Sequence, residues 1–152
     1  MPLKKSESLS NEFAFCVPGK PKGKARARMS SRTGRWYTPQ ATEDYEAEVQ
    51  QYALIAKPKR EYIEHPCRLT IEIWQQPPKS WSKKRKKEVT DLKYPITSKP
   101  DLDNIVKIIM DALNGIAWND DKQVYAIDAT RHYHEEEDQV SIRIRYSPMP
   151  CM

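Results

Sequence analysis

Residues 99–124 read KPDLDNIVKIIMDALNGIAWNDDKQV, and this stretch decides how the fold of the whole chain is interpreted. Pro100 suits the start of a helix, and Gly115 supplies a residue that can end one. Between them, at about 100° per residue, apolar side chains cover well over half of the helix circumference. A helix of this kind has to be largely buried, in a core or against a second subunit. We therefore expect a buried helix whose narrow polar stripe lines a cleft.

Carboxylates gather around this predicted helix. Asp101 and Asp103 open it, and Asp120 and Asp121 follow shortly after it ends. Acids at this density raise one another's pKa unless a cation lies among them. Mg²⁺ prefers a few carboxylates together with water and substrate phosphate, so the residues indicate metal-dependent chemistry on a phosphodiester. The alternative is that the aspartates only cap the helix and interact with its dipole, which explains the first pair better than the second.

Positive charge is concentrated in two segments, although the formal net charge of the chain is only +5. No acid occurs from residue 13 to residue 42, and the second segment, residues 79–88, holds a single glutamate. Two basic surfaces beside an acidic pocket are expected of a protein that grips a polyanion. A solvated basic segment is the alternative for either one alone. The cations that we expect to contact nucleic acid are Lys20, Lys22, Lys24, Arg26, Arg28, Arg32, Arg35, Lys83, Lys84, Arg85, Lys86 and Lys87.

Alternating apolar residues predict strands over about residues 13–17, 67–73, 124–133 and 140–146. Helical periodicity predicts two further helices, over about residues 40–57 and 81–89. Residues 20–35 lack an apolar period and are interpreted as a mobile basic loop, which Trp36, Tyr37 and Pro39 are expected to return to the core. We expect disorder over residues 1–11, one domain over 12–146 and a tail over 147–152.

Composition excludes several classes of protein. The chain has 152 residues, enough for one domain with a core of its own. No stretch approaches the roughly 20 apolar residues of a membrane span, and no signal-peptide core is present, so we expect no membrane partner. Cys16, Cys67 and Cys151 are predicted to be reduced thiols of a cytoplasmic protein. His132 and His134 share one face of a strand without a third ligand nearby, which favours an exposed or packed pair over metal binding.

The motif Asp-Leu-Asp-Asn at 101–104, a lysine at 107 and the run Trp-x-Asp-Asp-x-Gln-Val at 118–124 together resemble the RusA family of Holliday junction resolvases. The resemblance is close over residues 101–124 and holds in outline elsewhere. It implies that Asp101, Asp103 and Asp121 are metal ligands and that Lys107 is the catalytic lysine. Asp120 is implied as an adjacent essential or supporting acid. Residues 115–118 are one residue shorter than the family pattern, so the choice between Asp120 and Asp121 as primary ligand stays open.

The resemblance also implies an α+β fold, a homodimer and symmetric nicking of four-way DNA junctions. We therefore expect a single α+β domain with a mixed sheet of about four strands, packed by helices on one face. The implied cofactor is Mg²⁺, one ion or two, with Mn²⁺ substituting, and the implied setting is bacterial or phage-encoded recombination and repair. Two alternatives remain: a metal-dependent nuclease acting on flaps or duplex DNA, and a basic DNA-binding module without catalysis.

Overall fold

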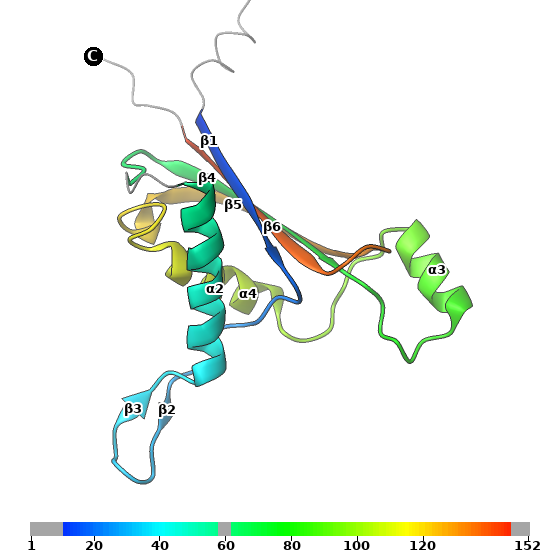
Figure 1. The fold of residues 1–152 in the computed structure, drawn as a ribbon, viewed down its shortest axis with the longest axis horizontal. Helices are drawn as coiled ribbons and strands as arrows, with labels where there is room; N and C mark the ends of the chain where they lie inside the picture. The colour runs from blue at the N-terminus through cyan, green and yellow to red at the C-terminus, as the bar shows by residue number, and fades with distance from the viewer. Residues whose placement is uncertain (1–10, 58–61, 147–152) are drawn as a thin grey trace, which may run out of the picture.

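A computed structural model describes residues 11–57 and 62–146. The expectations for residues 1–10 and 147–152 lie outside the described residues. Figure 1 shows the elements, which in chain order are β1 (Asn11–Pro18), β2 (Arg28–Met29), β3 (Trp36–Tyr37), α2 (Gln40–Ala56), β4 (Cys67–Gln75), α3 (Lys83–Asp91), α4 (Leu102–Leu113), the 3₁₀ helix η1 (Asp121–Gln123), β5 (Val124–Tyr133) and β6 (Gln139–Tyr146).

The main sheet is mixed and has four strands in the order β1-β6-β4-β5. β4 pairs in parallel with β5 and antiparallel with β6, and β1 pairs antiparallel with β6. A parallel pair needs a long crossover, and here the crossover from β4 to β5 contains α3 and α4. The sequence prediction of one α+β domain with a mixed sheet of about four strands is therefore confirmed.

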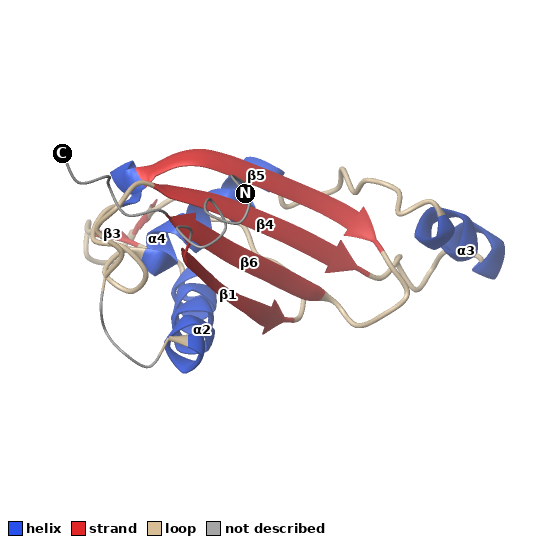
Figure 2. Ribbon diagram, turned by 90° about the horizontal axis from the view of Figure 1, so that it is seen from above, coloured by secondary structure: helices blue, strands red, loops and turns tan. Residues whose placement is uncertain are grey.

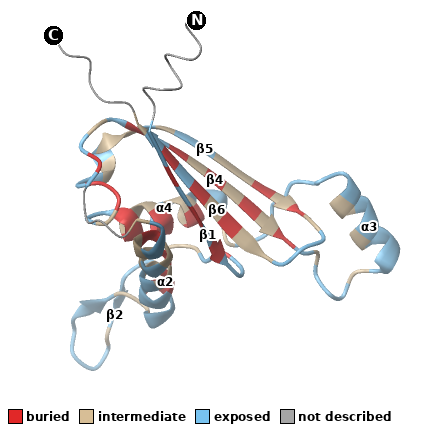
Figure 3. Ribbon diagram, turned by 45° about the horizontal axis from the view of Figure 1, so that its top comes forward, coloured by how far each residue is buried: buried red, intermediate tan, exposed pale blue. Residues whose placement is uncertain are grey.

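The core lies between one face of this sheet and the helices α2 and α4 (Figures 2 and 3). Alternate residues of β4, including Leu69, Ile71 and Ile73, are fully buried because strand side chains point to opposite faces in turn. The apolar side of α4 is buried against them, including Ile105 and Ile109. The helices thus cover one face of the sheet, as predicted. A single chain buries the apolar stripe of α4, so this stripe does not supply the subunit interface that we had considered for it.

Gly115 follows the end of α4 with a φ of 76°, the left-handed conformation expected of a residue that ends a helix. The C-terminal end of α4 therefore agrees with the sequence interpretation. No described helix is long and apolar enough to cross a bilayer.

The second basic segment and the distal part of the first extend away from the core. α3 has no buried residue and lies beyond the carboxyl ends of β4 and β5 (Figure 2). The predicted loop over residues 20–35 ends instead in a small hairpin, in which Arg28 pairs with Tyr37. Trp36 is 66% exposed, so the prediction that it returns the loop to the core is wrong. The reason is that the hairpin projects past the first turn of α2, where none of the described strands or helices covers it (Figure 1).

Candidate functional site

The segment that leads into α4 is fixed against the free edge of β5. The backbone N–H of Ile96 donates to the carbonyl of Arg131 at 2.9 Å, and that of Tyr133 donates to the carbonyl of Tyr94 at 3.0 Å. The Arg131 side chain, only 6% exposed, lies beneath this segment. Its Nη1 donates to the carbonyl of Pro100 at 2.9 Å and also to the carbonyl of Ser98. A buried arginine therefore positions the residues immediately before Asp101.

Our sequence analysis missed Arg131. The signal was available, because Arg131 falls between Ala129 and Tyr133 in the period-2 pattern of β5, on the face that turns toward the core. A charged residue in such a register position has to be paired or hydrogen-bonded.

Asp101 occupies the N-cap of α4, yet its side chain makes no capping hydrogen bond. Its backbone carbonyl instead accepts from the N–H groups of Asn104 and Ile105, each at 3.1 Å. Asp103 and Lys107 are exposed and lie four residues apart, so they share one side of the helix. Capping therefore does not account for the Asp101 carboxylate, which stays available to a ligand together with Asp103 and Lys107.

A second group of polar side chains lies at the other end of α4. Burial raises the pKa of Asp121, and the neighbouring carboxylates of Asp120 and Asp111 raise it further. A hydrogen bond from Asn114 opposes these effects and lowers the pKa of Asp121. Asp121 is thus a partly buried acid under repulsion from two others, which is an environment that a cation stabilises.

Asp120 has a different environment. It is the N-cap of η1, and its Oδ1 accepts from the backbone N–H of Lys122 at 3.0 Å. The side chain of Gln123 reaches back and accepts from the backbone N–H of Asp120 at 3.1 Å, which completes a capping box. The Lys122 N–H, with a smaller contribution from Asp121, lowers the pKa of Asp120. The spacing Asp-x-x-Gln at 120–123 is the sequence signal for this structural role.

The two groups of acids lie at opposite ends of α4. Asp103 and Asp111 are eight residues apart, which corresponds to about 12 Å along a helix, and Asp121 lies at the Asp111 end. Within residues 11–57 and 62–146, no three His, Cys, Asp or Glu side chains of the chain are grouped closely enough to hold a metal ion. One chain therefore does not by itself bring Asp101 and Asp103 together with Asp121.

The start of the first basic segment packs against α4. Lys24 forms ion pairs with Glu46 of α2 and with Asp111, the latter at 3.3 Å. Burial lowers the pKa of Lys24, but these two carboxylates raise it by more. A Cβ atom added to Gly23 would lie 2.9 Å from the Cβ of Pro100, so only glycine allows this approach.

Lys24 is thus tied to the protein, whereas the other predicted DNA-binding cations of this segment are exposed. None of these exposed cations forms an ion pair with a described residue: Lys20, Lys22, Arg26, Arg28, Arg32 and Arg35.

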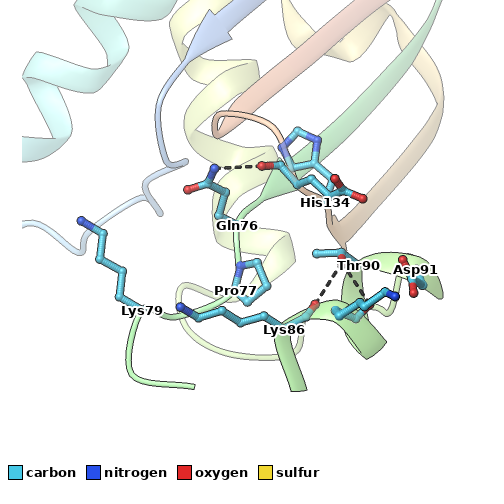
Figure 4. A pocket seen from close by; sticks show the side chains of 9 residues that line it. Gln76, Pro77, Lys79, Lys86, Thr90, Asp91 and His134 are labelled. Carbon is cyan, nitrogen blue, oxygen red and sulfur yellow. Dashed lines mark hydrogen bonds between the residues drawn. The ribbon is translucent and has the colours of Figure 1, made fainter. Parts of the chain in front are cut away.

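The second basic segment surrounds a cavity of about 490 Å³ between α3 and the turn after β5 (Figure 4). Lys79 and Lys86 line one side of it, and His134 lines another. His134 and His132 pack against Trp74, with ring centroids 5.6 and 5.5 Å apart, so of the two arrangements expected, exposed or packed, the structure has the packed one. The remaining predicted DNA-binding residues of α3 are exposed: Lys83, Lys84, Arg85 and Lys87.

Comparison with known proteins places this arrangement among nucleases. The family described as Endodeoxyribonuclease RusA matches residues 18–145, from the end of β1 to β6. A curated relative, the uncharacterized protein YqaN of Bacillus subtilis (strain 168), is 35% identical over 138 residues. That match covers 86% of this chain and 94% of the relative.

Proposed function

Because this chain belongs to the RusA endodeoxyribonuclease family, we propose that it resolves four-way DNA junctions by symmetric nicking, in DNA recombination and repair. The observation that carries the proposal is the N-terminal half of α4. There Asp101, Asp103 and Lys107 are exposed, and Asp101 has no capping role to explain its side chain. The exposed cations of the two basic segments supply surfaces that suit a polyanion.

We propose Asp101, Asp103 and Asp121 as the ligands of Mg²⁺, with Mn²⁺ able to substitute. Carboxylates are the donors that Mg²⁺ prefers, and the raised pKa of Asp121 marks repulsion that a cation relieves. When bound, the metal would polarise the phosphodiester and lower the pKa of the attacking water. The Asp120 side chain is already engaged in capping η1, which is a supporting role, so Asp121 is the better primary ligand of the two. Lys107 stabilises the negative charge that develops on the phosphate oxygens.

The separation of the acids along α4 supports a site built by two protomers. In a two-fold dimer both subunits present the same residues, so Asp101 and Asp103 of one protomer can be completed by the partner subunit's Asp121. Such a dimer has two equivalent sites, which match the two equivalent strands that a junction offers.

Subunit exchange tests the shared site. Asp103→Asn and Asp121→Asn homodimers are each expected to be inactive, but their mixed dimer contains one site with all ligands intact and should nick one strand. A mixture of Asp101→Asn and Asp103→Asn dimers is the matched control, because every site in it lacks one ligand. Equal inactivity of both mixtures, with exchange shown by mass spectrometry, would contradict the shared site.

Substrate choice tests the function itself. Four-way junctions, flaps and linear duplexes are compared at equal concentration, with and without Mg²⁺. We expect paired nicks on the junction only, and only with metal. Equal cleavage of flaps or duplex would identify a less selective nuclease, and tight binding without any cleavage would identify a DNA-binding module.

A further inference from the structure

A small cavity beside the N-terminus of α4 has a lining of unusual charge. It measures about 220 Å³ and lies between Lys20, Gln75 and the segment from Ile96 to Pro100. Three cations line it, Lys20, Lys99 and Arg131, and no carboxylate does. The cavity next to α3 differs, because Asp91 and Glu135 accompany its lysines. The smaller cavity, which we call the Arg131 pocket, is therefore the more strongly electropositive of the two.

Arg131 carries a buried charge with no anionic partner among the described residues. Its Nε and Nη1 atoms donate to three neutral oxygens, which belong to Gln75, Ser98 and Pro100. Nη2 donates to no described group, and it is not among the fully enclosed polar atoms that lack a partner. Nη2 therefore reaches the accessible surface, and the surface that Arg131 lines is that of the pocket. A guanidinium held in this way offers its free edge to an anion.

We propose that the Arg131 pocket binds one phosphate group of the DNA backbone, next to the phosphodiester that is cut at Asp101 and Asp103. The inference rests on the proposed function and adds a second phosphate-binding site to it. At about 220 Å³ the pocket is smaller than the roughly 300–1,000 Å³ of sites for drug-sized ligands, so it suits a phosphate group better than a whole nucleotide.

The pocket lies close to Asp101, so a phosphate bound in it would position the DNA strand near the proposed metal site. Lys99 and Pro100 line the Arg131 pocket and also an adjoining cavity that contains Asp101 and Asn104. A strand anchored by one phosphate in the pocket therefore lies next to Asp101, one of the side chains that we propose to hold the metal. Arg131 also donates to the carbonyls on both sides of Lys99, so the group that binds this phosphate is the one that positions the segment before Asp101.

Neutral phosphate analogues test the site directly. Single methylphosphonates are placed in turn along the cleaved strand of a junction, and binding is measured without metal. For the wild-type protein we expect one position, adjacent to the cut, to lose about tenfold in affinity, the effect of one lost charge-assisted hydrogen bond. For Lys99→Gln the same methylphosphonate should cost clearly less than tenfold, because one of the three cations that line the pocket has been removed. Arg145→Gln, which removes an exposed cation from β6, is the matched control and should keep the tenfold loss.

The anchoring role of Arg131 could make its variants unfold, so Lys99→Gln carries the test, with Arg131→Lys as a second variant that retains the charge. If no position distinguishes wild type from Lys99→Gln, the proposal is overturned, whether or not the protein cuts junctions.

Inorganic phosphate separates the site from the nuclease activity. At constant ionic strength we expect millimolar phosphate to raise the melting temperature of the wild-type protein more than chloride does, and this difference should be smaller for Lys99→Gln. Stabilisation by phosphate without any methylphosphonate effect would overturn the assignment to DNA and identify a site for free phosphate. The absence of both effects would leave Arg131 with a structural role only and would overturn the proposal that the Arg131 pocket binds phosphate.

Discussion

The indole Nε1 of Trp118 donates a 2.7 Å hydrogen bond to Oδ1 of Asn114. Trp118 is completely buried, so this bond fixes the Asn114 amide from the core side. The amide nitrogen is then left to hydrogen-bond Asp121. The residue that we propose as the third metal ligand is therefore oriented through Asn114 by a tryptophan of the hydrophobic core.

This relationship predicts coupling between Trp118 and Asn114. Trp118→Phe and Asn114→Ala should each destabilise the protein, and the double variant should lose less than the sum of the two. The expected coupling is about 0.5–1.5 kcal/mol, the range for one hydrogen bond between neighbouring residues. Urea unfolding of the four proteins measures it. Strictly additive losses would show that the hydrogen bond contributes nothing.

The ion pairs of Lys24 predict that cations of the first basic segment have two different roles: Lys24 stabilises the fold, whereas exposed cations such as Arg28 bind DNA. Lys24→Gln leaves Glu46 and Asp111 without their cation, so it should lower stability by about 1 kcal/mol but leave the salt dependence of junction binding unchanged. Arg28→Gln removes an exposed cation of the hairpin and should do the reverse. Its plot of log affinity against log salt should flatten by about 0.9, the value for one lost phosphate contact. The outcome that contradicts this division is a flattened slope for Lys24→Gln with unchanged stability.

The buried thiol of Cys67 predicts that the stability of the protein falls at high pH. Its thiol is fully buried, donates to the carbonyl of His65 at 3.1 Å, and has a pKa raised by burial to about 11. The folded state therefore favours the neutral thiol. Its stabilising effect is complete below the unfolded pKa of about 8.5 and is lost as the pH rises from there through about 11.

Urea unfolding between pH 8 and 11 measures this loss of stability, and thiol labelling checks the burial of Cys67 on which it depends. At pH 8 iodoacetamide should modify the exposed Cys16 in the native protein, and Cys67 only after unfolding, as peptide mapping by mass spectrometry would show. Comparable native labelling of the two would place Cys67 outside the core.

The sequence predicts the fold well because its patterns are strong. The alternation over residues 67–73 and 140–146, and the apolar stripe of α4, correspond to elements that the core buries on the expected sides. The two-residue strands of the hairpin leave no such pattern, since two residues cannot define a period. The exposure of Trp36 also cannot be predicted from composition, because it depends on how far the hairpin extends beyond α2.

The candidate site is only partly predictable. The motif around Asp101 identifies the acids, but their spacing along the chain does not show that α4 separates Asp103 from Asp121. Arg131 and the ion pairs of Lys24 depend on contacts between residues far apart in sequence, which no local pattern records. The difference between Asp120 and Asp121 is unpredictable for a similar reason. Asp120 is hydrogen-bonded within η1, whereas Asp121 also interacts with Asp111 and Asn114 at the C-terminal end of α4.

The most direct test of the account is junction cleavage by Asp103→Asn. This change keeps the size of the side chain and the helix-capping tendency but removes one charge from the proposed metal site. We predict a protein that folds and binds junctions without metal at least as tightly as wild type, yet cuts them in Mg²⁺ slower by orders of magnitude. Cleavage by folded Asp103→Asn at a rate near that of the wild type would contradict the central claim.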